Sequence, residues 1–236
     1  MNRLDGRVVA IAGAAGGLGP TVASALAQEG ARLALTDVDQ GRLDEVAGRL
    51  GLPSDQIDAR VVDLLDEDAT RAWAAALTER FGAVDALVHL VGGWRGGQPL
   101  DQAPLADWDW LHDLLIRTVQ HTSRAFAAPL RASARGRFVL VSAAGAQKPT
   151  STNAAYAAAK AAAEAWTLAL ADELAGTSAT ANILVVNAIL SPQMRAENPD
   201  KEYPTFTSAE DIAEAIAYVL SDAAAKMNGK RLALHP

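Results

Sequence analysis

Tyr156 and Lys160 are the two residues in this sequence whose types and spacing best fit proton-transfer chemistry. Residues four apart on an α-helix share one face, so the lysine ammonium can lie near the tyrosine hydroxyl. A free tyrosine has a pKa near ~10, and a nearby cation lowers that value by favouring the phenolate. A phenol with a lowered pKa can give or take a proton near neutral pH. By itself the spacing is more typical of an ordinary helix, so its interpretation depends on the rest of the chain.

A glycine-rich segment near the start of the chain predicts a binding site for a diphosphate. Gly13, Gly17 and Gly19 follow an apolar segment at intervals of four and two. Glycine tolerates positive φ and lets a ligand approach the backbone closely. A helix beginning near Leu18 would point its free N–H groups and positive dipole end at a diphosphate. The alternative is a tight strand-to-helix connection, but an acidic residue about twenty positions further on favours a dinucleotide site.

That acidic residue is Asp37, at the end of the second apolar segment. Its carboxylate can accept hydrogen bonds from the adenosine ribose hydroxyls and would repel a 2′-phosphate. Val38 follows it, and the glycine segment contains neither Arg nor Lys. We therefore expect NAD rather than NADP as the cofactor. The alternative is that Asp37 and Asp39 only cap the next helix.

Short apolar segments alternate with longer helical patterns, which predicts a doubly wound α/β fold with helices on both faces of a parallel sheet. The expected strands are 7–12, 32–36, 60–62, 86–91, 138–141, 183–187 and 231–234. The expected helices lie near 18–29, 41–50, 67–81, 108–132, 153–175 and 209–221. No repeat, linker or change of composition interrupts the chain, so we expect a single domain over residues 1–236.

Composition argues against several classes of partner and site. The chain has 21 Lys and Arg against 28 Asp and Glu, a formal net charge of −7 and no basic block. That balance is unfavourable for binding nucleic acid or an anionic membrane. The sequence contains no cysteine, and nothing in it supports a metal site. No apolar run reaches the ~20 residues that span a bilayer, and no apolar signal region is visible, so we expect a cytoplasmic protein.

The stretch 153–175 is alanine-rich around nearly its whole circumference. A helix without a broad polar face is usually buried. One side would face the sheet, and the other side also needs cover. We expect a subunit interface there, with burial inside one subunit as the alternative.

Further motifs continue the pattern along the chain: Val62-Asp63-Leu64, Gly92-Gly93 and the segment 136–142, which ends at Ser142. Together with the glycine segment and the Tyr156/Lys160 pair, they resemble a short-chain dehydrogenase/reductase over essentially the whole length. The resemblance implies a Rossmann-type sheet of about seven strands, a homodimer or homotetramer built through long helices, and hydride transfer between a nicotinamide cofactor and an alcohol or carbonyl compound.

The same resemblance implies roles for individual residues. Asp63 and Leu64 would contact the adenine, and Gly92 would lie by the adenosine ribose. Lys160 would bind the nicotinamide ribose in addition to its role beside Tyr156.

Other positions depart from the family pattern. Leu115 occupies the position of the family's catalytic asparagine and cannot hold the water that relays protons. His89 stands within the segment that usually carries asparagine, where it either replaces one hydrogen bond or is a satisfied buried histidine. The catalytic serine is either Ser142 or absent, because counting thirteen residues back from Tyr156 gives Ala143. On a strand, a shift of one residue turns the side chain to the opposite face.

Two functions remain after these comparisons of residues. The leading hypothesis is an NAD-dependent oxidoreductase in which Tyr156 exchanges the substrate proton, Lys160 holds the ribose, and Ser142 hydrogen-bonds the substrate oxygen. Trp94 either forms a wall of an apolar substrate pocket or packs under a loop. The alternative is a catalytically impaired dinucleotide-binding sensor or assembly protein, which Leu115 and the uncertain serine favour. The short segment 192–208 predicts a short substrate lid.

Overall fold

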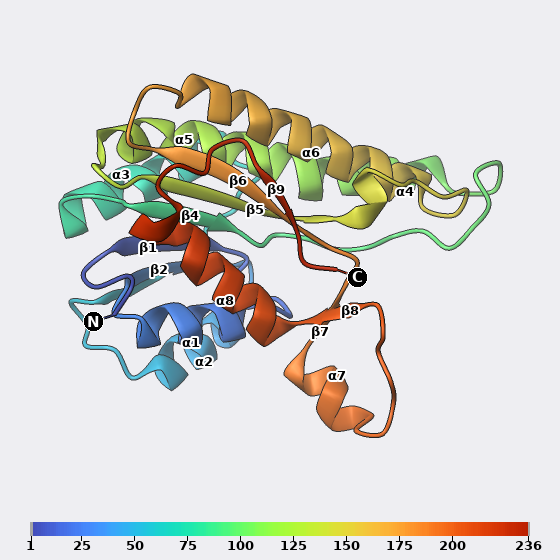
Figure 1. Ribbon diagram of the computed structural model, residues 1–236, viewed down its shortest axis with the longest axis horizontal. Helices are drawn as coiled ribbons and strands as arrows, with labels where there is room; N and C mark the ends of the chain where they lie inside the picture. Colours follow the sequence, from blue (N-terminus) through green and yellow to red (C-terminus); the bar gives the residue numbers. More distant parts are fainter. Residues whose placement is uncertain (1, 236) are drawn as a thin grey trace.

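A seven-stranded parallel sheet organises the protein, and the computed structural model describes it within residues 2–235 (Figure 1). The strand order is β3-β2-β1-β4-β5-β6-β9. The bounds are β1 (Val8–Ala12), β2 (Arg32–Thr36), β3 (Ile57–Ala59), β4 (Ala86–His89), β5 (Arg137–Ala143), β6 (Thr180–Val186) and β9 (Arg231–Ala233). This arrangement confirms the doubly wound α/β fold expected from the sequence.

Helices cover both faces of the sheet, as Figure 1 shows. One face is covered by α1 (Gly19–Gln28), α2 (Gln40–Leu50) and α8 (Ala209–Leu220), and the other by α3 (Glu67–Phe81), α5 (Thr118–Ala132) and α6 (Ala154–Glu173). Alternate residues of β1 pack into the two layers: Val9 and Ile11 belong to one apolar cluster, Val8 and Ala10 to the other. Burial on both sides explains why the strands are continuously apolar.

The third strand lies earlier in the chain than expected. Residues 60–62 were expected to form it, but Ile57–Ala59 pairs with β2 instead. Asp58 interrupts the apolar pattern of this strand, which hides it from a hydropathy argument. The Asp58 side chain is buried and accepts a hydrogen bond from Arg60 Nε at 2.7 Å.

The long helix expected over residues 108–132 has a different internal structure. It begins earlier, as α4 (Leu105–His112), and continues into α5 through a π-helical turn, Asp113–Arg117. Such turns insert one extra residue into a helix and are frequent at functional sites. Leu115, at the position of the family's asparagine, lies within this turn.

The segment after β6 folds into a small separate unit. Its strands β7 (Ala188–Leu190) and β8 (Phe206–Ser208) pair with each other, and α7 (Pro192–Glu197) lies between them in the chain. In Figure 1 this unit extends beyond the main sheet, below the carboxyl ends of the strands. None of the helices described between residues 2 and 235 combines the length and apolar character that crossing a bilayer requires.

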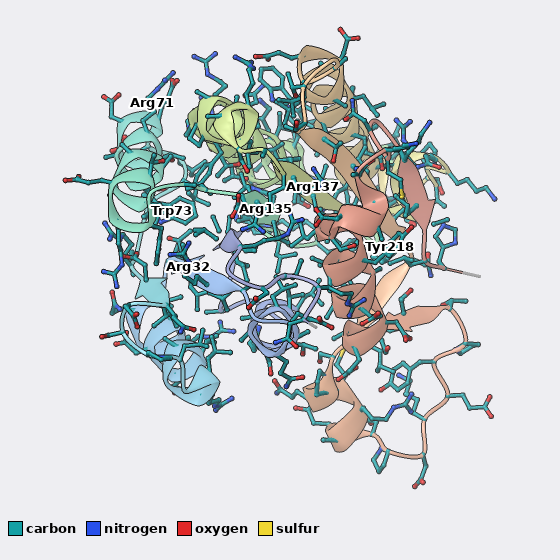
Figure 2. All side chains as sticks on the ribbon, turned by 60° about the vertical axis from the view of Figure 1, so that its left-hand side comes forward. Arg32, Arg71, Trp73, Arg135, Arg137 and Tyr218 are labelled. Atoms are coloured by element: carbon teal, nitrogen blue, oxygen red, sulfur yellow. The ribbon has the colours of Figure 1, made fainter. Side chains whose placement is uncertain are left out.

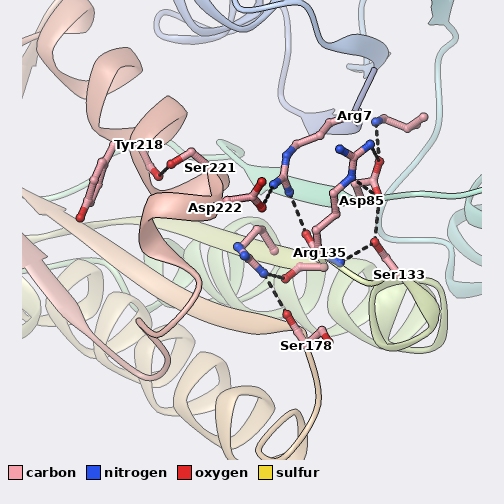
Figure 3. Close-up of polar contacts among 11 residues, drawn as sticks. Arg7, Asp85, Ser133, Arg135, Ser178, Tyr218, Ser221 and Asp222 are labelled. Carbon is pink, nitrogen blue, oxygen red and sulfur yellow. Dashed lines mark hydrogen bonds and ion pairs between the residues drawn. The ribbon is translucent and has the colours of Figure 1, made fainter. Parts of the chain in front are cut away.

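A cluster of buried charges lies near the amino ends of the strands (Figures 2 and 3). Arg7 and Arg137 are both almost completely buried, and burial lowers the pKa of each guanidinium. Arg7 donates a hydrogen bond to the carbonyl oxygen of Arg135 at 3.0 Å and pairs with Asp222. Arg137 is held by carbonyl oxygens, including that of Ser178 at 3.0 Å. Of the two buried cations, Arg7 is therefore paired with a carboxylate, and Arg137 is held by backbone carbonyl groups.

We expect Asp222→Asn to lower the free energy of unfolding by about 2 kcal/mol, because Arg7 would stay buried without its counter-ion. The value lies below the usual range for breaking a buried pair, since the Asp222 side chain itself faces water. Urea denaturation of the variant measures the change. Asp200→Asn removes the same charge from an exposed position and is the matched control. Equal midpoints for the two variants would contradict the expectation.

Candidate active site

One cavity of about 900 Å³ lies over the carboxyl ends of the strands. Parallel sheets of this type bind ligands at that edge, where the strand order reverses. Nearly all the site residues expected from the sequence line it: Gly13, Gly17, Leu18, Asp37, Asp63, Leu64, Gly92, Ser142, Tyr156 and Lys160. Gly19 is not among the lining residues but lies against Ala14 of the same turn. The structure thus brings together residues that are as far apart in the sequence as Gly13 and Lys160.

The glycine turn has the shape of a cradle for an anionic group. Gly13 has φ +83°, and a Cβ there would lie 2.9 Å from the Val91 nitrogen. At Gly19 a Cβ would lie 2.2 Å from the Ala14 carbonyl oxygen, so only glycine fits. Gly17 has open space where its Cβ would be. Helix α1 begins at Gly19 with no side chain capping its first N–H groups, which leaves them available to a diphosphate.

Asp37 supports this turn directly. Its Oδ2 accepts the backbone N–H of Ala15 at 2.8 Å, and its Oδ1 accepts that of Val38 at 2.8 Å. Sequence reasoning identified no cation near Asp37, but the structure places one there. Arg42, in the first turn of α2, donates to the Ala15 carbonyl oxygen at 2.6 Å. Asp37 and Arg42 therefore bind the N–H group and the carbonyl group of the same turn residue, Ala15.

Tyr156 and Lys160 lie on one face of α6, as their spacing predicted, and both line the cavity. The Lys160 ammonium donates to the carbonyl oxygen of Val141 at 3.0 Å. The Tyr156 hydroxyl has no protein partner within the described residues. Burial raises the pKa of Tyr156 to about 12 and lowers the pKa of Lys160 to about 8. The shift of Tyr156 is opposite to the one expected, because desolvation of the phenol dominates and the ammonium is directed at the strand.

Ser142 faces a buried carboxylate that sequence reasoning missed. Its hydroxyl donates to Glu164 Oε1 at 2.6 Å, and Arg231 Nε donates to Glu164 Oε2 at 2.6 Å. Both Ser142 and Glu164 are 1% exposed. Glu164 follows Lys160 by one helical turn, so the spacing 156, 160, 164 was the available signal. The next strand residue, Ala143, points its methyl group to the opposite face.

The neighbouring polar residues have structural partners. His89 is fully buried between the hydroxyls of Thr118 and Thr122, at 3.3 and 3.1 Å. Burial lowers its pKa to about 3, so the imidazole is neutral and behaves as a satisfied buried histidine. Leu115 packs in an apolar cluster and presents no polar group. Within residues 2–235, no group of three or more His, Cys, Asp or Glu residues could hold a metal ion.

Comparison with known proteins agrees with this geometry. The model of the short chain dehydrogenase family matches residues 7–202. D-threitol dehydrogenase of Mycolicibacterium smegmatis is 29% identical over 98% of this chain and 92% of its own length. 2-(S)-hydroxypropyl-CoM dehydrogenase 3 of Xanthobacter autotrophicus is 30% identical over 99% of this chain and 96% of its own length.

A solved structure of 3-ketoacyl-(acyl-carrier-protein) reductase from Brucella melitensis, complexed with NADH, is similar throughout. It superposes with a TM-score of 0.84 at 26% identity, and the match covers 98% of each chain. The family match, the full-length relatives and the glycine-turn cavity with its Tyr156/Lys160 pair lead to one conclusion. The chain belongs to the short-chain dehydrogenase family of oxidoreductases.

Proposed function

We propose that this oxidoreductase uses NAD(H) to interconvert a small alcohol and its carbonyl compound. The observation that carries the proposal is the convergence of the glycine turn and the Tyr156/Lys160 pair in one cavity. The turn's uncapped N–H groups fit a diphosphate, and the phenol has no competing partner among residues 2–235. The overall reaction is carbonyl + NADH + H⁺ ⇌ alcohol + NAD⁺.

The chain's residues divide between binding and proton transfer in this proposal. The diphosphate is bound by the glycine turn with its helix start: Gly13, Gly17, Leu18 and Gly19. Asp37 binds the adenosine ribose, where Gly92 allows close approach, and Asp63 and Leu64 contact the adenine. Lys160 holds the nicotinamide ribose. The nicotinamide, when bound, supplies or accepts the hydride. Tyr156 gives its hydroxyl proton to the carbonyl oxygen in reduction and takes it from the alcohol in oxidation.

Ser142 is the proposed donor to the substrate oxygen, but its hydroxyl would first have to leave Glu164. The alternative is that Tyr156 alone contacts that oxygen, with Ala143 in the serine's place. Ser142 would then serve to position the end of β5. A change at Ala143 distinguishes the two arrangements.

If Ala143 stands in the serine's place, Ala143→Ser should raise kcat at least about tenfold, because it adds a hydroxyl on the face opposite Ser142; if Ser142 is the donor, the same change should leave kcat unchanged. One donor to a developing oxyanion is typically worth ~10²–10³ in rate, and a new one in an unoptimised site recovers part of that. Steady-state kinetics with NADH and a carbonyl substrate measure the effect. Ala144→Ser, one residue beyond β5, is the control. A rate unchanged in Ala143→Ser, together with a large loss in Ser142→Ala, would favour Ser142 as the substrate's partner.

Glu164 provides a test of how the Lys160 charge is maintained. Burial lowers the lysine pKa and the Glu164 carboxylate opposes that shift; His89, facing Lys160 from β4, is neutral. Lys160 is therefore charged below about pH 8, and Glu164→Gln should move its titration to lower pH. The pH dependence of covalent labelling of the amine, followed by mass spectrometry, measures this. Glu173→Gln on the exposed part of α6 should leave it unchanged, and an unshifted titration in Glu164→Gln would contradict the expectation.

Two finer features belong to the same proposal. NAD is preferred over NADP because the Asp37 carboxylate would repel a 2′-phosphate. The active form is a homodimer or homotetramer assembled through the long helices, a view supported by the small exposed side chains of Ala158, Ala165 and Ala169 on the outer face of α6. A cytoplasmic location stays a prediction.

The direct test follows a deuterium atom from 4-deuterated NADH into the alcohol product of a carbonyl panel, detected by mass spectrometry. Transfer of the label would support the enzyme. Tight NADH binding without transfer to any carbonyl would instead favour the sensor function, which Leu115 and the Ser142–Glu164 bond make a specific alternative.

A further inference from the structure

The end of the cavity beyond Tyr156 is walled by apolar side chains. Trp110 and Leu114 lie there, and both approach Gly93 so closely that a Cβ at Gly93 would be 2.5 Å from Trp110 Cη2 and 2.8 Å from Leu114 Cδ2. Leu114 and Tyr156 both line the cavity and both pack against the same buried apolar cluster. The wall residue Leu114 and the reacting phenol therefore share one apolar support.

Trp110 is also held by a stacked cation. The guanidinium of Arg95 lies over its ring at 4.2 Å from the centroid. Arg95 is itself paired with Asp107 at 3.2 Å. The stacked and paired arginine fixes the indole plane, so the wall offers a flat surface to a flat ligand. Trp94, Ile189 and Met194 complete the apolar lining.

Charge in the cavity opposes an anionic substrate. Among the described lining residues, Lys160 is the one cation, against Asp37, Asp63 and Asp113. The Lys160 ammonium already donates to Val141, and Asp113 is paired with Arg117 outside the lining. Arg95, stacked on Trp110, is outside the lining and is already paired with Asp107. A carboxylate, phosphate or coenzyme A thioester would therefore lose water here without gaining an unpaired cation. An unpaired charge in such a site is strongly unfavourable.

Each polar side chain at this end, apart from Tyr156 and the charged residues, already makes a hydrogen bond within the protein. Thr118 donates a hydrogen bond to the Leu114 carbonyl oxygen at 2.6 Å, and Ser142 donates one to Glu164. Asn187 donates to the Thr205 carbonyl oxygen. Ser191 accepts the Met194 N–H and so caps α7. Tyr156 is therefore the one hydroxyl in the described cavity lining without a protein partner. A polyhydroxylated substrate would find few groups to replace its bound water.

We propose, resting on the oxidoreductase function above, that the substrate is an uncharged carbonyl compound, or its alcohol, with an apolar ring-sized body. The ring packs on Trp110 and Leu114, and the reacting oxygen, which meets Tyr156, is the one polar group of this body. Trp110 acts as a specificity-determining residue through the flat surface that it presents.

A matched pair of substrates tests this class. The methyl ester of 4-oxocyclohexanecarboxylic acid and the free carboxylate share the same ring ketone and differ in charge. With NADH, kcat/KM for the ester should exceed that for the carboxylate by at least about 100-fold. Fructose, a polyhydroxylated ketone, should be at least as poor as the carboxylate. A carboxylate or fructose that reacts as well as the ester would overturn the proposal.

A binding measurement separates this proposal from the enzymatic function. Cyclohexanecarboxamide and cyclohexanecarboxylate cannot be reduced, and their binding to the NADH-saturated protein can be followed by NADH fluorescence. Preference for the amide without turnover of any ketone would support the substrate class and overturn the enzymatic function. Turnover of a ketone combined with tighter binding of the carboxylate would support the enzymatic function and overturn the proposed substrate class.

Two tryptophan variants on the same helix complete the test. Trp110→Ala should weaken binding of the amide and raise KM for the ester at least about tenfold, with the affinity for NADH unchanged. Trp108→Ala removes an equally exposed indole that does not line the cavity and should change neither value. Equal behaviour of the two variants would overturn the role assigned to Trp110.

Discussion

Tyr156→Phe is expected to lower kcat/KM for carbonyl reduction by about 10³-fold, with NADH affinity unchanged within about twofold. The substitution removes the one cavity hydroxyl that we propose as proton donor. Because the Tyr156 hydroxyl has no protein partner in the described structure, its loss leaves no buried group unsatisfied, and the fold should keep its stability. Steady-state kinetics, NADH fluorescence titration and thermal unfolding measure the three quantities.

Tyr218→Phe supplies the control for this substitution. Tyr218 is 41% exposed on α8, remote from the cavity lining, and should tolerate loss of its hydroxyl without effect on rate. A Tyr156→Phe variant that keeps more than a tenth of the original activity would show that another group delivers the proton. A variant that loses NADH affinity as well would place the tyrosine in cofactor binding.

Asp37→Asn is expected to change cofactor preference toward NADPH by about 100-fold in the ratio of the two kcat/KM values. The amide oxygen can still accept the Ala15 N–H, so the turn keeps that bond and loses the one from the Val38 N–H, while the charge that repels a 2′-phosphate is removed. Arg42 already lies on the other side of Ala15 and can bind the phosphate. A charge-assisted hydrogen bond and relief of like-charge repulsion together account for a change of this size.

The double variant Asp37→Asn/Arg42→Leu identifies the source of that change. It should lose most of the gained activity with NADPH and keep its activity with NADH. If the double variant used NADPH as well as the single one, Arg42 would have no part in the preference. If the single variant did not change preference, a residue other than Asp37 would exclude the 2′-phosphate.

Much of the sheet could be predicted because its strands are buried on both faces. A strand such as β1 shows this burial locally, as an unbroken apolar run, without knowledge of its neighbours. Ile57–Ala59 could not be found this way, because Asp58 is buried through contacts with two arginines, Arg60 close by in the sequence and Arg80 from α3 at 3.5 Å. Hydropathy cannot reveal a charge that is buried by pairing with other charged side chains.

The candidate site was predictable where spacing within one element determines geometry. The 156/160 pair and the glycine turn are of this kind. Glu164 shares the same helical face, yet its burial depends on Ser142 from β5 and Arg231 from β9, which the helix alone does not specify. Arg42 reaches the turn from a separate helix, and the π-helical turn around Leu115 has no simple sequence signal. These features arise from tertiary packing.

The buried arginine cluster and the cavity lie at opposite ends of the parallel strands. Arg7 and Arg137 contact the amino ends, whereas the glycine turn and Tyr156 are at the carboxyl ends. Replacing a buried ion pair by apolar residues of similar volume is often neutral or stabilising. The molecule therefore offers protein engineers a region for improving heat tolerance whose described arginines and their partner Asp222 do not line the cavity, so durability and turnover can be optimised separately.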